Sequence, residues 1–84
     1  MTNSEGTPEA KFRFLADEAL QSDFKLVSEW SGREISIAPG QWVDVECINA
    51  DGTPVEIEAR ADGSIAVYAK YVSITGEDGA ERLS

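Results

Sequence analysis

Histidine is absent from the 84-residue sequence, and cysteine occurs once. Without imidazole there are no histidine metal ligands, no Ser-His-Asp or Cys-His catalytic arrangement, and no histidine general base near neutral pH. The single thiol, Cys47, excludes an intramolecular disulfide and therefore a secreted, disulfide-stapled framework. Cys47 alternates with apolar residues, Val43 and Val45, a pattern typical of an inert, buried thiol.

Positive charge is also scarce, because seven Lys and Arg stand against 16 Asp and Glu and the formal net charge is -9. Affinity for a phosphate backbone comes from clustered cations that release counterions, so direct nucleic-acid binding is not expected. No apolar run approaches the roughly 20 residues that span a bilayer. Residues 1–8 lack the basic and apolar regions of a signal peptide. These features predict a soluble protein in the cytoplasm, either of its own cell or of a host cell.

The length predicts one small domain. Residues 1–6 are expected to be a disordered tail and residues 76–84 a flexible C-terminal tail, which leaves a single folded domain over residues 7–75. At its start, Thr7, Pro8 and Glu9 give the N-cap, first-position proline and first-turn acid of a helix. Apolar residues at spacings of three and four then predict a helix over residues 8–22. They are Phe12, Leu15, Ala16, Ala19 and Leu20.

After residue 23 the apolar pattern changes to a period of two, interrupted by turn dipeptides. The fold class predicted is α+β, with one N-terminal helix followed by a five-stranded antiparallel β-meander, strongly curved or closed into a small SH3-like barrel. The stretch Pro39-Gly40-Gln41-Trp42-Val43 resembles the strand starts of small SH3-like barrels. The last strand is long enough to bend or bulge. The strands are expected at residues 24–30, 34–38, 42–48, 53–60 and 64–75.

Two Ala-Asp-Gly turns, at residues 50–52 and 61–63, suit three-residue hairpins and set a register. The second hairpin would pair Ile57 with Val67, and the first would pair Val45 with Ile57. A turn at residues 39–41 would pair Ile35 with Val45. Every inward pair is then apolar. This register predicts one buried sheet face made of Val43, Val45, Ile57, Ala59, Ile65 and Val67.

The same register predicts an acidic outer face with aromatic rings at its border. Carboxylates would lie directly opposite each other in two pairs, which destabilises a sheet, so the face is not optimised for stability. Such a surface focuses negative potential and selects cationic partners, and aromatic rings are common at interface hot spots. The candidate partner-binding residues are Asp44 opposite Glu58, Glu46 opposite Glu56, Glu34 across from Glu46, Tyr68 opposite Glu56, and Trp42 opposite Arg60.

Three chemical functions are not favoured by the sequence. A glycosidase needs two carboxylates beside a cleft with one pKa raised by burial, whereas these acids lie on a solvated strand face. The Asp-Gly turns lack the staggered acids of a calcium-binding loop. Nucleotide binding is not expected, because the glycines lie in isolated turns and there is no lysine-bearing phosphate-binding loop. The sequence therefore predicts a protein that is not an enzyme and has no cofactor or metal.

The leading hypothesis is a small acidic protein-binding module. It would be an inhibitor or adaptor whose sheet face occludes a basic, nucleic-acid-binding surface of a larger protein, for example a phage-encoded antagonist or an immunity protein. Two alternatives remain open. One is a structural or assembly subunit that self-associates through a sheet edge or an apolar helix face, with acids that only solubilise it. The other is a small barrel that binds a small molecule or sugar through Trp30 and Trp42.

Overall fold

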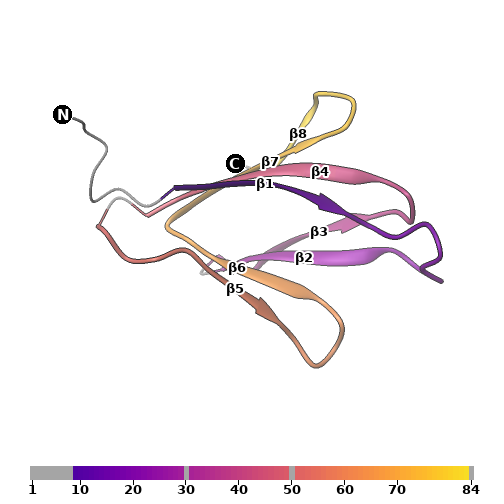
Figure 1. Cartoon of the computed structure of the whole chain (residues 1–84), viewed down its shortest axis with the longest axis horizontal. Helices are drawn as coiled ribbons and strands as arrows, with labels where there is room; N and C mark the ends of the chain where they lie inside the picture. Colours follow the sequence, from indigo (N-terminus) through magenta and orange to yellow (C-terminus); the bar gives the residue numbers. More distant parts are fainter. Residues whose placement is uncertain (1–8, 30, 50, 84) are drawn as a thin grey trace.

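A computed structural model describes residues 9–29, 31–49 and 51–83, which fold into two four-stranded β-sheets (Figure 1). Sheet A has the strand order β1 (Glu9–Leu15), β4 (Trp42–Ile48), β7 (Tyr71–Gly76) and β8 (Glu81–Leu83). Sheet B has the order β3 (Arg33–Ile37), β2 (Phe24–Glu29), β6 (Ile65–Tyr68) and β5 (Glu56–Ala59). Among these eight strands, β2 and β6 pair in parallel and the other neighbours are antiparallel.

The predicted helix over residues 8–22 is wrong, because the described residues 9–22 form β1 and a turn. β1 follows a period of two, with Phe12 and Phe14 half-buried and Lys11 and Arg13 exposed. The helical interpretation leaves Phe14 outside the apolar stripe, whereas its ring packs on Phe24 at 5.1 Å between centroids. Pairing with β4 therefore outweighs the local helix signals. The α+β class is corrected to all-β for the described residues.

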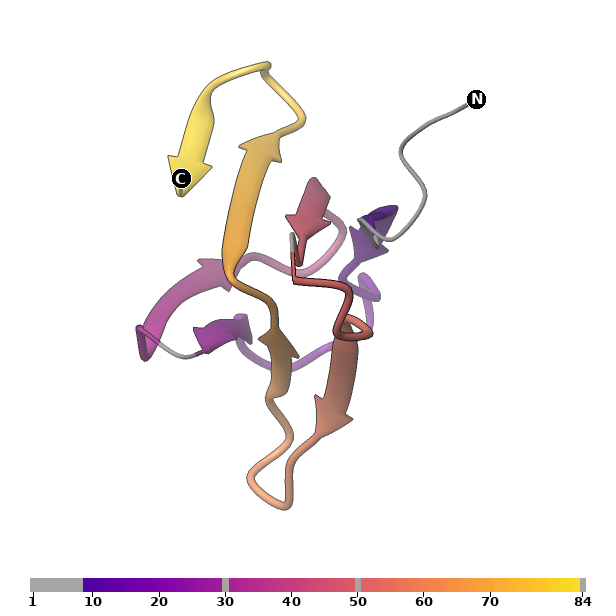
Figure 2. The same ribbon diagram turned by 90° about the vertical axis from the view of Figure 1, so that its left-hand side faces the viewer.

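The strand positions are predicted better than their partners. β4 has the predicted bounds, residues 42–48. The long strand expected over residues 64–75 divides into β6 in sheet B and β7 in sheet A, so that the chain bends from one sheet into the other (Figure 2). β4 pairs with β1 and β7, and it lies in a different sheet from β5. The predicted pairs of Val45 with Ile57 and of Asp44 with Glu58 are therefore wrong.

The hairpin between β5 and β6 has the predicted register, with Ile57 opposite Val67 and Ala59 opposite Ile65. Gly63 in its turn has a φ of 89°, the left-handed conformation that glycine tolerates best. The turn at residues 39–41 does not form the expected hairpin, because β3 and β4 on either side of it lie in different sheets. β3 pairs with β2, which places Ile35 opposite Leu26 instead of Val45.

The C-terminal end of the described chain is a further strand. The sequence predicts a flexible tail over residues 76–84, whereas Glu81–Leu83 form β8 and pair with β7. The hairpin that joins them is closed by hydrogen bonds from the N–H of Gly76 to the carbonyl of Ala80 and from the N–H of Gly79 to the carbonyl of Gly76. Leu83 is buried, so β8 contributes to the core. The tail expected at residues 1–6 lies outside the described residues.

The core lies between the sheets and is aliphatic. The prediction of burial is confirmed for Val43, Val45 and Val67, which are nearly inaccessible. It is wrong for Ile57, which is 55% exposed, and for Ala59, because β5 is an edge strand in which all four residues are exposed. The fully buried side chains of the core are Leu26, Ile37, Val43, Val45, Cys47, Val67 and Ile74.

Candidate functional site

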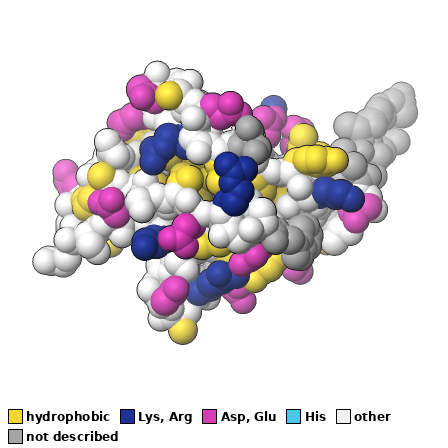
Figure 3. Space-filling view, turned by 180° about the vertical axis from the view of Figure 1, so that it is seen from behind, with side chains coloured by type: hydrophobic (Ala, Val, Ile, Leu, Met, Phe, Trp, Pro, Cys, Tyr) yellow, Lys and Arg dark blue, Asp and Glu magenta, His cyan; other side chains and the backbone are white. Residues whose placement is uncertain are grey.

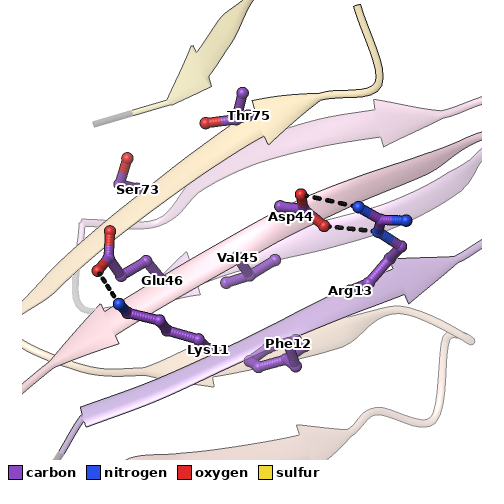
Figure 4. Close-up of a pocket in the computed structure, with 8 residues that line it drawn as sticks. All are labelled: Lys11, Phe12, Arg13, Asp44, Val45, Glu46, Ser73 and Thr75. Carbon is purple, nitrogen blue, oxygen red and sulfur yellow. Dashed lines mark hydrogen bonds and ion pairs between the residues drawn. The ribbon is translucent and has the colours of Figure 1, made fainter. Parts of the chain in front are cut away.

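The outer face of sheet A carries opposite charges side by side on β1 and β4 (Figure 4). The Arg13 guanidinium donates from Nε to Asp44 Oδ1 at 2.7 Å and from Nη2 to Asp44 Oδ2 at 3.2 Å. One row further along, Lys11 Nζ lies 3.5 Å from Glu46 Oε2. The hydrogen bonds from Arg13 hold the pKa of the Asp44 carboxyl below its usual value. Both carboxylates of β4 are therefore balanced by cations of β1.

The neighbouring strand β7 places hydroxyl groups beside the two carboxylates of β4. Thr75 lies opposite Asp44 and Ser73 opposite Glu46. Together with the β1 cations, these side chains line a shallow groove of about 440 Å³ (Figure 4). The Trp42 ring adjoins this surface, and the guanidinium of Arg13 lies 3.6 Å from the ring centroid. One face of the ring thus already holds a cation from the same chain.

A second charged cluster lies on the outer face of sheet B. Arg60 Nη2 donates to Glu29 Oε2 at 2.6 Å and to Tyr68 Oη at 3.0 Å, and Arg60 Nε donates to Glu58 Oε1 at 3.2 Å. The Tyr68 hydroxyl donates to the same Glu58 oxygen at 2.8 Å. Bonds from Tyr68 and then Arg60 lower the pKa of Glu58, while bonds to Glu29, Tyr68 and Glu58 raise the pKa of Arg60. This cluster links β2 to the β5–β6 hairpin.

The predicted acidic face does not exist as one surface, and on the side shown in Figure 3 Lys and Arg side chains lie among the Asp and Glu side chains. Its five carboxylates are divided between the two sheets, and four of them lie beside a Lys or Arg. The pair of Tyr68 with Glu56 is confirmed. Trp42 lies opposite Leu15 and not Arg60. Asp44, Glu46 and Trp42 are in sheet A, whereas Glu56, Glu58, Tyr68 and Glu34 are in sheet B.

Six exposed carboxylates that make no ion pair among the described residues lie in turns at one end of the molecule, while Asp51, Glu56 and Glu81, which also make none, lie elsewhere. Hydrogen bonds from Ala16 N–H to the Gln41 carbonyl and from Gly40 N–H to the Ala16 carbonyl join the β1–β2 loop to the β3–β4 turn. A cavity of about 140 Å³ joins that turn to the β7–β8 turn, and another depression joins the β1–β2 loop to the β5–β6 turn. Among the described residues, these exposed acids, termed the acidic end, have no ion pair: Asp17, Glu18, Asp23, Asp62, Glu77 and Asp78.

Apolar side chains are exposed at the same end. Leu15 is 69% exposed and lies directly opposite the half-buried Trp42. Leu20, in the β1–β2 loop, is 37% exposed. The sequence interpretation assigned both leucines to the apolar face of a helix. The alternation from Lys11 to Leu15 was the available signal, because a period of two places Leu15 on the same outer face as the charged residues.

The thiol of Cys47 lies away from these surfaces. It is buried between the sheets, as the sequence predicts. Burial, with a smaller contribution from Glu46, raises the pKa of the thiol from 9.0 to about 11. A thiol with this pKa stays protonated near neutral pH, and the thiolate is the reactive form. We therefore do not assign Cys47 to a site.

The described ranges contain no group of three or more His, Cys, Asp or Glu side chains placed to hold a metal ion. Within the same ranges there is no helix that could cross a membrane. Trp30, one of the two rings of the sugar-binding hypothesis, lies outside the described residues. Comparison with models of protein families, with curated proteins and with solved structures finds no match to this chain.

Proposed function

We propose that the protein is a small binding module that docks onto a basic surface of a larger protein through its acidic end. One observation carries this proposal: Leu15 is exposed beside Trp42 at the end of the molecule where six carboxylates without ion pairs lie in the turns. Interfaces typically combine a few apolar or aromatic anchors with a polar rim that excludes water. The acidic end offers both parts.

The charge distribution favours this end over the strand faces. On the strands, cations such as Arg13 and Arg60 hold the neighbouring carboxylates at hydrogen-bond distance. The six acids of the turns make no ion pair among the described residues, so we expect a negative potential at the acidic end. A field of this kind accelerates association with cationic surfaces and selects against acidic ones. A basic nucleic-acid-binding surface fits this requirement, and the bound module would occlude it sterically.

The test compares two variants that remove the same charge from different places. Glu18→Gln with Glu77→Gln removes two of the six carboxylates of the acidic end, and Glu46→Gln with Glu58→Gln removes two strand carboxylates. A partner captured from native lysate by the wild-type protein and eluted by salt is then purified, and its association rate is measured at low ionic strength. We expect the first variant to slow association about tenfold and the second to change it little. Equal rates for the two variants would contradict docking through the acidic end.

The apolar anchor has its own readout. Leu15→Ser keeps the charge and removes an exposed side chain, so the fold should be retained. We expect it to raise the dissociation rate while leaving the association rate and its salt dependence nearly unchanged, because short-range packing acts mainly after encounter. An unchanged dissociation rate would exclude Leu15 from the interface.

A further inference from the structure

Among the described residues, each sheet has an edge strand on the same side of the molecule that pairs with a neighbour on one side only. β1 is the last strand of sheet A and β5 the last strand of sheet B. Figure 2 shows β1 and β5 on one side, with β8 and β3 on the opposite side. Unpaired edges present rows of free N–H and C=O groups, which bind further strands unless they are protected.

The inner faces of these two strands are also incompletely covered. Phe12 and Phe14 of β1 are only half-buried, whereas Val43 and Val45 of the neighbouring β4 are nearly inaccessible. In β5 every residue is exposed, including the inward-facing Ile57 at 55%. A strand added beside either edge would therefore bury apolar surface as well as satisfy backbone groups.

The charges of the two edges are complementary. The exposed positions of β1 include Lys11 and Arg13, two residues apart, and those of β5 include Glu56 and Glu58 at the same spacing. If Phe12 lies opposite Ile57, both carboxylates lie beside the two cations, whichever direction the strands run. Opposite charges across neighbouring strands stabilise a sheet. The resulting rows would continue those of sheet A, where the same cations already contact Asp44 and Glu46.

Pairing of like edges is opposed by the same charges. An antiparallel β1–β1 pair in which all seven residues overlap is centred on Phe12 and brings Lys11 beside Arg13. An antiparallel β5–β5 pair centred on Ile57 brings Glu56 beside Glu58. Like charges directly opposite each other destabilise a sheet. The edge pattern thus favours β1 with β5 over either edge with itself.

We propose that the chain forms a closed dimer in which β1 of each copy pairs with β5 of the other. Because both edges lie on one side, a two-fold rotation satisfies both pairings at once and leaves neither edge open. Such an interface is isologous and does not propagate into a fibre. Each sheet A would continue into sheet B of the second copy. This inference does not rest on the proposed function, because it depends on the edges of β1 and β5 and not on the acids of the turns.

Sedimentation velocity over a range of protein concentration tests the dimer. We expect a species of twice the 9.1 kDa chain mass whose dissociation constant rises with salt, because the exposed charges are screened. Ile57→Lys places a charge in the interface at a position exposed in the single chain. It should raise the dissociation constant at least about tenfold, since the dimer contains the position twice. Tyr71→Ser is the control, because Tyr71 is 61% exposed and lies on β7, away from both edges.

A charge exchange defines the register. Glu56→Lys should weaken the dimer, and combining it with Lys11→Glu or with Arg13→Glu in the same chain should restore it. Rescue by the first combination indicates parallel strands, and rescue by the second indicates antiparallel strands. The dimer proposal is overturned if the wild-type chain stays monomeric throughout, if Ile57→Lys leaves the dimer intact, or if Tyr71→Ser dissociates it equally. Assemblies that grow beyond two chains would exclude the closed pairing.

Discussion

Cys47 shows how the position of one residue determines its chemistry. The thiol is buried and its pKa is raised to about 11. In the unfolded chain the thiol would ionise near its ordinary pKa of 9.0, so between these values the folded state binds more protons than the unfolded state. Stability is therefore unaffected by this group below pH 9 and falls as the pH rises from 9 toward 11.

The first prediction compares wild type with Cys47→Ala. The free energy of unfolding, measured by denaturant titration between pH 8 and 11, should fall more steeply with pH for the wild type. Lysines and tyrosines titrate in both proteins, so the difference between the two curves isolates the thiol. A thiol reagent at pH 7.5 should label native wild-type protein only as fast as the protein opens. Parallel pH curves, or rapid native labelling, would contradict the buried thiol.

Among the loops, the segment between β4 and β5 shows why turn chemistry alone does not fix strand pairing. The sequence signal at residues 50–52 resembles that of the β5–β6 hairpin, and Gly52 has the expected positive φ of 86°. β4 and β5 nevertheless enter different sheets. The buried side chain of Asn49 spans the loop, donating from Nδ2 to the Pro54 carbonyl at 3.2 Å and accepting at Oδ1 from the Lys70 N–H at 2.6 Å.

Asn49→Ala should cost about 1 to 3 kcal/mol of unfolding free energy, because it removes two hydrogen bonds made by a buried side chain, each worth about 0.5 to 1.5 kcal/mol. The Asn49 side chain is 2% exposed, so in the wild type its amide bonds to these two backbone groups and not to water. The matched control is Thr53→Ala in the same loop, whose side chain is exposed. Equilibrium denaturation of both variants measures the difference. If the two substitutions cost the same, the Asn49 side chain does not hold the loop.

Hydrophobic periodicity and turn dipeptides predicted some of the strands and not others. The alternation of Trp42–Ile48 defines β4, since one face must enter the core. In the segment Glu9–Leu15, the spacing of Phe12 and Leu15 fits a helix as well as the alternation of Phe12 and Phe14 fits a strand. Only the cross-strand partners on β4 decide between them. Asp78-Gly79 carries the same turn signal as Asp62-Gly63 and could have revealed the β7–β8 hairpin.

For the molecule as a whole, net charge is visible in the sequence but its distribution is not. The register that predicted opposed carboxylates on one face is replaced by pairings that place Lys11 and Arg13 next to Glu46 and Asp44. Partner strands distant in sequence determine which acids are balanced. Local hairpin signals therefore could not predict where the carboxylates lie in the fold. The composition did predict that the molecule carries more acids than its cations can balance.

The last prediction uses this difference between balanced and unbalanced acids. Asp44→Asn removes the carboxylate that accepts two hydrogen bonds from Arg13, so the melting temperature at pH 7 should fall. Glu18→Gln with Glu77→Gln removes charges that have no ion pair among the described residues. The melting temperature of this double variant should therefore stay level or rise at low salt, and the gain should shrink as salt screens the remaining acids.

The melting temperature of Asp44→Asn should also depend on pH in a characteristic way. The pKa of Asp44 is lowered in the folded state, so its contribution is present above the ordinary value of 3.8 and is lost as the pH falls through the lower, folded-state pKa. The deficit of Asp44→Asn relative to wild type, measured by thermal unfolding from pH 7 to 2.5, should therefore close at the acidic limit. A deficit that persists there would show that Asp44 stabilises the fold without its charge. A fall in melting temperature for both variants at pH 7 would show that the acids of the turns are balanced too, and the acidic end would then lose the unbalanced field on which its docking role depends.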